Sequence, residues 1–113
     1  MTKQVKQNIF DETKNNLLPL FNGSLRKIIL YGSYARNDET EESDIDIMVL
    51  TDLDKDTISK LHDKIIDVIV ELSLKYNIVL SIKALNEKHF NKYLDILPYY
   101  QNIQKEGVVL YER

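Results

Sequence analysis

Apolar residues recur along this chain with two different periods, and the change of period separates helices from strands. Over residues 3–18 they return about every four positions, which predicts an amphipathic helix ended by Pro19 and the Asn22–Gly23 pair. The same spacing over residues 57–75 predicts a second, long helix. Three shorter apolar runs predict strands at 26–31, 43–50 and 78–85.

The C-terminal part of the chain predicts smaller elements. Asn86 is expected to cap a short helix that runs to Tyr93, and Pro98 is expected to start another helix that Gly107 ends. Residues 108–111 follow as a last short strand. This alternation of helices and strands predicts an α/β (α+β) fold, in which helices flank one small mixed sheet.

Length and composition restrict the class of protein. The chain has 113 residues, of which 43% are hydrophobic and 29% charged, so a single globular domain over 1–113 is expected. The net charge of −3 and the absence of a Lys/Arg run argue against duplex DNA as a partner. Cysteine is absent, which excludes disulfides and a thiol nucleophile. Without a long apolar run or a signal peptide, a cytoplasmic protein with no membrane partner is expected.

Two carboxylates open the second predicted strand. Asp44 and Asp46 are two residues apart, so on a strand their side chains point to the same face while Ile45 points into a core. Neighbouring carboxylates repel each other, and a cation between them removes the repulsion. Oxygen ligands of this kind suit Mg²⁺, which completes its coordination shell with phosphate and water. The pair therefore predicts a metal site.

A small turn precedes these carboxylates. The first predicted strand runs directly into Gly32-Ser33, and a short helix over 33–37 is expected to follow. Such a turn offers backbone N–H groups to a phosphate. Arg36 lies on the same helical face as Ser33, where its guanidinium suits either a phosphate or the acidic loop 38–42, through Asp38 or Glu39.

The alternative interpretation is a tight turn followed by an acidic surface strand. It explains Gly32, but it leaves unexplained why two aspartates open a strand, where Asp is disfavoured.

The motif resembles a known superfamily. Gly-Ser followed ten residues later by Asp-x-Asp is similar to the DNA polymerase β-like nucleotidyltransferases, and the short chain resembles their minimal nucleotidyltransferase (MNT) domains. The matching positions are Gly32, Ser33, Ala35, Arg36, Ser43, Asp44 and Asp46. The family usually has Gly at position 37, where this chain has Asn37, a residue that tolerates a left-handed backbone.

The resemblance implies an enzyme, its cofactor and a partner. It implies metal-dependent transfer of NMP, in particular AMP, from ATP or another NTP to an acceptor, with two Mg²⁺ ions held by the catalytic Asp44 and Asp46. Gly32, Ser33 and Arg36 would bind the nucleotide. The implied role is that of the antitoxin in a HEPN/MNT toxin–antitoxin pair, which adenylylates a tyrosine of its all-helical HEPN partner.

The third predicted strand departs from the family pattern. A third carboxylate usually lies there, but residues 78–85 contain no Asp or Glu; Ser81 is the best positional match, and Lys83 lies on the same face. The enzyme either works with two aspartates, or it has lost turnover and binds a nucleotide or a partner. A small-molecule (antibiotic) nucleotidyltransferase completed by dimerisation is a further alternative, so a homo-oligomer stays open.

Tyrosines gather toward the C-terminus. They are Tyr93, Tyr99, Tyr100 and Tyr111. Packing at the edge of the core and a role in an interface are both consistent with this clustering.

Overall fold

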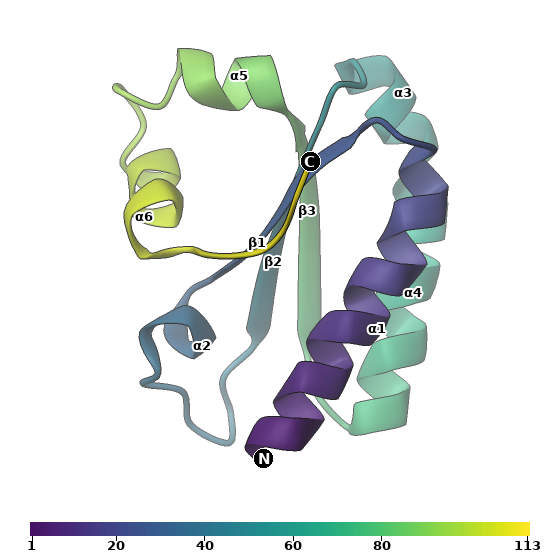
Figure 1. The fold of residues 1–113 in the computed structure, drawn as a ribbon, viewed down its shortest axis with the longest axis vertical. Coiled ribbons are helices and arrows are strands. Elements are labelled where there is room, and N and C mark those ends of the chain that lie inside the picture. Colours follow the sequence, from purple (N-terminus) through teal and green to yellow (C-terminus); the bar gives the residue numbers. More distant parts are fainter.

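A four-stranded mixed sheet forms the centre of the molecule, which a computed structural model describes over all residues, 1–113 (Figure 1). The strands are β1 (Leu25–Tyr31), β2 (Ile45–Thr51), β3 (Leu80–Asn86) and β4 (Val108–Glu112). Their spatial order is β3-β2-β1-β4. β2 and β3 are parallel, whereas β1 is antiparallel to both β2 and β4. The mixed sheet with flanking helices confirms the fold class expected from the sequence.

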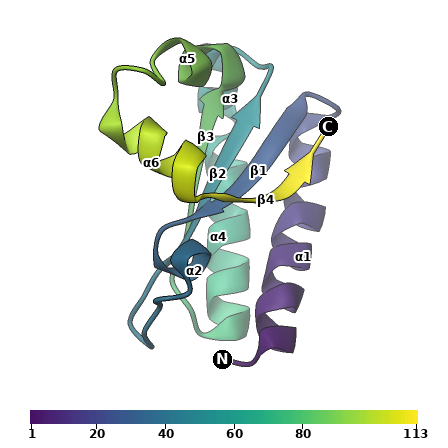
Figure 2. The same ribbon diagram turned by 60° about the vertical axis from the view of Figure 1, so that its left-hand side comes forward.

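Helices cover both faces of this sheet (Figure 2). They are α1 (Lys3–Phe21), α2 (Ser33–Arg36), α3 (Lys55–Lys60), α4 (His62–Tyr76), α5 (Glu87–Lys92) and α6 (Pro98–Glu106). The two long helices α1 and α4 pack on one face, and α5 and α6 pack on the other (Figures 1 and 2). None of these helices combines the length and apolar character that crossing a membrane requires.

The sheet therefore separates two cores. The core beneath α1 and α4 contains 14 buried residues, and the core beneath α5 and α6 contains six. β2 contributes to both, since Ile45, Ile47 and Val49 belong to the larger core while Met48 and Leu50 belong to the smaller one. Burial on both faces explains why this strand is apolar at nearly every position after Asp46.

The first helix is longer than the sequence indicates. It continues through Pro19 to Phe21 and ends at Asn22, whose φ of 47° is left-handed. Proline lacks an N–H, so it removes one hydrogen bond near the end of the helix, where few turns depend on it. Leu17 and Phe21, one turn apart and both buried, hold this last turn against the core.

The prediction of one helix over 57–75 is wrong. The segment forms two helices, α3 and α4, which meet at Leu61. α3 also starts earlier, because the carboxylate of Asp54 accepts a hydrogen bond from the backbone N–H of Thr57 at 2.8 Å and caps the helix. The apolar periodicity continues across Leu61 since this residue also packs against the core, so the pattern does not reveal the break.

The remaining boundaries differ by one or two residues. β2 starts at Ile45, so Asp44 lies just before the strand, and β3 starts at Leu80 rather than at 78. The side chain of Asn86 accepts a hydrogen bond from the N–H of His89 at 3.0 Å, which confirms the predicted cap of α5. α6 begins at Pro98 as predicted.

Candidate active site

The two halves of the sequence motif meet at one end of the sheet. In the antiparallel pairing of β1 with β2, Tyr31 lies opposite Asp46, which brings the next residue, Gly32, beside the same carboxylate. A Cβ atom added to Gly32 would lie 2.6 Å from Oδ2 of Asp46, closer than real Cβ contacts allow. The Gly-Ser turn and the Asp46 carboxylate therefore share one place, and a side chain at position 32 would displace the carboxylate.

The backbone of the turn also requires glycine. Gly32 has φ 78° and ψ −157°, a conformation essentially restricted to glycine. It directs the chain from β1 into α2, and its carbonyl accepts hydrogen bonds from the N–H groups of Ala35 and Arg36 at 3.1 and 3.2 Å. Asn37 ends α2 with φ 59°, so the expectation that it tolerates a left-handed backbone is confirmed.

Asp44 and Asp46 act on each other electrostatically. Asp46 is partly buried, and this burial, followed by the negative charge of Asp44, raises its pKa above the ordinary value of an aspartate, while Lys83 opposes the rise. A cation between the two carboxylates would remove that repulsion. The chain offers no group of three or more acidic, His or Cys side chains placed to hold a metal. Two carboxylates are nevertheless the usual protein contribution to a Mg²⁺ site that substrate phosphates and water complete, so the donors fit this ion.

The third strand brings a hydroxyl and an ammonium to the site. β3 runs parallel to β2 with Ser81 beside Asp46 and Lys83 beside Met48, so both side chains lie on the Asp46 side of the sheet. Ser81 thus occupies the strand position next to the Asp46 carboxylate, where the family resemblance implies an acidic residue. Lys83 is close enough to oppose the pKa rise of Asp46, and its Nζ lies 5.4 Å from the ring centre of Tyr99.

A tyrosine pair beside Asp46 was not identified from the sequence. The hydroxyls of Tyr31 and Tyr99 lie 2.7 Å apart, and the rings meet edge to face with centroids 6.0 Å apart. Burial, the hydrogen bond to Tyr99 and the charge of Asp46 together raise the pKa of Tyr31, which keeps its phenol protonated. Tyr31 lies opposite Asp46 through the antiparallel register of β1 with β2. Tyr99, on the distant α6, carries no local signal.

Arg36 binds carboxylates in this structure. Its Nε lies 3.1 Å from Oδ2 of Asp38, and its Nη1 lies 3.2 Å from Oε2 of Glu106 on α6. Of the two loop partners expected from the sequence, Asp38 forms the pair, whereas Glu39 pairs with Lys6. Arg36 therefore connects α2 to α6, and its contact with a phosphate stays a prediction.

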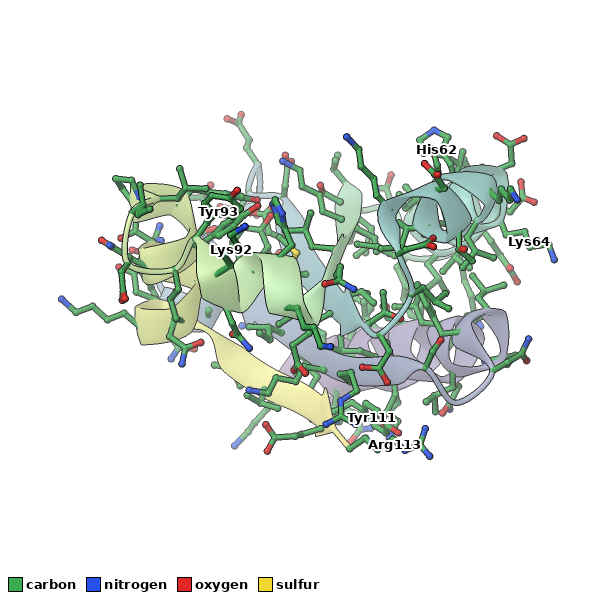
Figure 3. The ribbon with its side chains drawn as sticks, turned by 90° about the horizontal axis from the view of Figure 1, so that it is seen from above. His62, Lys64, Lys92, Tyr93, Tyr111 and Arg113 are labelled. Carbon is green, nitrogen blue, oxygen red and sulfur yellow. The ribbon has the colours of Figure 1, made fainter.

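The C-terminal tyrosines divide between core and surface. Tyr100 is buried, Tyr93 packs against the smaller core and Tyr111 against the larger, whereas Tyr99 is exposed and reaches Tyr31. Figure 3 shows Tyr93 at the end of α5, on the opposite side of the sheet from His62 at the start of α4. The start of α4 and all of α5 lie at the end of the molecule away from α2, so neither His62 nor His89 joins the aspartates (Figure 1).

Known proteins of one family match this chain. The sequence model of the nucleotidyltransferase domain matches residues 11–110. The chain belongs to the nucleotidyltransferase domain family. A Methanocaldococcus jannaschii protein named as a protein adenylyltransferase is 42% identical over 100 residues, which cover 88% of this chain and 92% of that relative. A second protein of that organism and name is 40% identical over 73 residues, covering 65% of this chain and 72% of the relative.

Solved structures share the fold. A crystal structure of a nucleotidyltransferase from Sulfolobus solfataricus has a TM-score of 0.61 at 16% identity, covering 97% of this chain and 86% of that one. A crystal structure of a toxin–antitoxin with AMP-PNP has a TM-score of 0.53 at 20% identity, covering 88% and 73%. The resemblance to nucleotidyltransferases and the enzyme class expected from the sequence are confirmed.

Proposed function

We propose that this nucleotidyltransferase transfers AMP from ATP to a hydroxyl group of a partner protein, with Mg²⁺ as cofactor. The observation that carries the proposal is the contact of Gly32 with the Asp46 carboxylate. This contact brings a turn with free N–H groups and a pair of mutually repelling carboxylates to one site. Triphosphate and divalent cation are the ligands that satisfy both at once.

Each residue of the site has a role in this reaction. Asp44 and Asp46 would hold the Mg²⁺, which, when bound, neutralises phosphate charge and orients the triphosphate. The turn at Gly32 and the Ser33 hydroxyl would bind the β- and γ-phosphates, and Arg36 would exchange its exposed carboxylate partners for a phosphate. The two-ion arrangement implied by the resemblance needs substrate oxygens to supply the ligands that a third carboxylate would give.

The transfer itself is a substitution at phosphorus. The acceptor oxygen forms a bond to the α-phosphorus, the bond from that phosphorus to the bridging oxygen breaks, and pyrophosphate leaves. The acceptor hydroxyl loses its proton to solvent, because Ser81 is no base at neutral pH. Lys83, on the same side of the sheet as Asp46, adds positive charge where negative charge accumulates.

The acceptor class is proposed from two relatives and the fold. The similar Methanocaldococcus jannaschii proteins are named as protein adenylyltransferases, and a toxin–antitoxin solved with AMP-PNP shares this fold. We infer a tyrosine on a helical HEPN partner as the acceptor, and hence an antitoxin role.

Intact-mass spectrometry tests the proposal. The full chain is incubated with a candidate helical HEPN partner, ATP and Mg²⁺, and the partner should gain the mass of AMP on a tyrosine. Asp44→Asn and Asp46→Asn should each abolish the gain, while Asp95→Asn, at an exposed position between α5 and α6, should retain it. A partner that stays unmodified with wild type while forming a complex would contradict the transfer.

Ser81 favours a second candidate function, a nucleotide- or partner-binding module without turnover. The residue beside Asp46 on β3 is a hydroxyl, so the site lacks the general base that typically contributes about 10²–10⁴-fold to a rate. Calorimetry with ATP separates the candidates. The enzyme requires ATP binding that depends on Mg²⁺, whereas equal affinity with and without Mg²⁺, or no binding, supports the module.

A further inference from the structure

A cavity adjoins the candidate active site without being part of it. It has a volume of about 780 Å³ and lies between the first turn of α1, the acidic loop after α2, and the segment that joins α4 to β3. Neither Asp44 nor Asp46 lines it, but Ser43, the residue just before Asp44, does. The volume is in the range of ligand sites, roughly 300–1,000 Å³.

The inner wall of the cavity is apolar and firmly held. Val5, Tyr34, Tyr76, Ile78 and Val79 contribute to it. Val79 is 60% exposed, although its carbonyl accepts a hydrogen bond from the N–H of Ile45 at 2.9 Å, which anchors this segment to β2. A large apolar side chain exposed on an anchored segment is surface that a partner can cover.

The rim of the cavity carries three glutamates, Glu39, Glu41 and Glu42, against two positive groups, the Lys6 side chain and the N-terminal ammonium of Met1, so negative charge is in excess. Glu39 is neutralised by Lys6, whose Nζ also lies 5.7 Å from the ring centre of Tyr34. Glu41 and Glu42 are exposed and take part in no ion pair.

The loop that carries these two glutamates has a defined shape. Thr40 and Ser43 close it, because the N–H of Thr40 donates to Oγ of Ser43 at 2.9 Å and the N–H of Ser43 donates to the carbonyl of Thr40 at 3.1 Å. The negative rim is therefore presented in a fixed place beside the apolar wall.

We propose that this cavity binds a short basic and apolar segment of the protein that receives AMP. Lys or Arg side chains of the segment would pair with Glu41 and Glu42, while aliphatic side chains would cover Val79 and the two tyrosines. A nucleotide is disfavoured here because the same glutamates repel its phosphates.

Docking at this cavity would serve the transfer directly. The segment would lie against Ser43, the residue that precedes Asp44 in the chain. Holding the acceptor there would raise its effective concentration at the site. The inference rests on the proposed protein acceptor, and it names the surface that recognises it.

Fluorescence anisotropy with two labelled peptides tests the proposal on the full-length chain. Both peptides carry one tyrosine between leucines and have equal length; one is flanked by arginines and the other by glutamates. The basic peptide should bind about tenfold more tightly, and added salt should weaken its binding. The double variant Glu41→Lys/Glu42→Lys should lose about tenfold in affinity for it.

Matched variants separate this cavity from general charge attraction. Asp67→Lys/Asp95→Lys makes the same change of net charge at exposed residues outside the cavity and should bind the basic peptide like wild type. Val79→Ser should weaken binding about threefold while leaving the salt dependence unchanged, since it removes apolar contact only.

Three results would overturn the proposal. They are equal affinity for the two peptides, no binding of either, or a loss in the control double variant as large as in the cavity variant. Calorimetry with ATP and Mg²⁺ on the same proteins keeps this test separate from the proposed function. If wild type binds no ATP, the proposed nucleotidyl transfer alone is refuted. If wild type binds ATP but not the basic peptide, the proposed docking at the cavity alone is refuted.

Discussion

The two faces of the sheet differ in how completely helices cover them. The long helices α1 and α4 lie along one face and bury a core of 14 residues, whereas the short helices α5 and α6 bury six residues on the other. β2 shows the difference within one strand. Ile47 is fully buried beneath the long helices. Its neighbour Asp46 points to the other face, where α5 and α6 leave its side chain partly exposed. The candidate site thus lies where the helical cover ends, and a carboxylate there can be held by the fold and still reach a ligand.

Ile47→Ala should produce the largest change in stability. Truncating this fully buried side chain removes apolar burial and leaves a cavity, so the free energy of unfolding should fall by about 2–5 kcal/mol. Urea unfolding measures it, and the folded protein should still bind ATP with Mg²⁺. Leu74→Ala, at a residue 78% exposed, should change stability by less than about 0.5 kcal/mol. Similar losses in both variants would contradict the assignment of the larger core.

Asp46→Asn, unlike Ile47→Ala, should increase the stability of the fold while it weakens ATP binding. The loss of a metal carboxylate should weaken Mg²⁺-dependent ATP binding by roughly a hundredfold or more, measured by calorimetry. The midpoint of thermal unfolding without ligand should rise by about a few degrees, because the variant no longer buries a charge that Asp44 repels.

The stability gain of Asp46→Asn should depend on pH. The pKa of Asp46 is raised in the folded state, so the wild-type carboxylate destabilises the fold at neutral pH. As pH falls through the folded pKa toward the unfolded value of about 3.9, wild type becomes protonated and the difference between the two proteins disappears. A gain that is independent of pH would show that burial and repulsion of this charge are not its cause.

Gly32→Ala should damage both the turn and the carboxylate. A residue with a side chain is strained by about 1–3 kcal/mol in this backbone conformation, and its Cβ would meet Oδ2 of Asp46. Thermal unfolding should report the strain and calorimetry the loss of ATP binding. Gly23→Ala is the matched control, with a φ of 89° and only the Arg113 side chain near its Cβ. It should cost stability alone, and an equal loss of ATP binding in it would refute a special role of Gly32.

Ser81→Asp should have the smallest effect of these variants, an increase in Mg²⁺ affinity. A carboxylate beside Asp46 supplies a third anionic oxygen ligand, so Mg²⁺ affinity should increase about tenfold, and the rate of AMP transfer should increase with it. Lys83 limits the gain since its ammonium already compensates part of the negative charge. Ser81→Ala should show no gain, and slower transfer by the Asp variant would mean that another residue serves as the base.

Local features of the fold were predictable from the sequence. The Asp-x-Asp spacing, the cap at Asn86 and the start of α6 at Pro98 depend on residues a few positions apart. The break at Leu61 and the passage of α1 through Pro19 were not predictable, because packing against the core decides both. Periodicity reports which side of a helix is buried, and it does not report where one helix ends and the next begins.

The same division holds for the candidate site. By itself the sequence determined which groups are candidates for the chemistry, Gly32, Ser33 and the two aspartates, since their types and spacing are local properties of the chain. Only the tertiary structure decided that Gly32 lies against Asp46, that Ser81 pairs beside it, and that Tyr99 and Glu106 on α6 reach Tyr31 and Arg36. These contacts join segments distant in the chain, and strand register and helix packing, rather than neighbouring residues, set the distances between them.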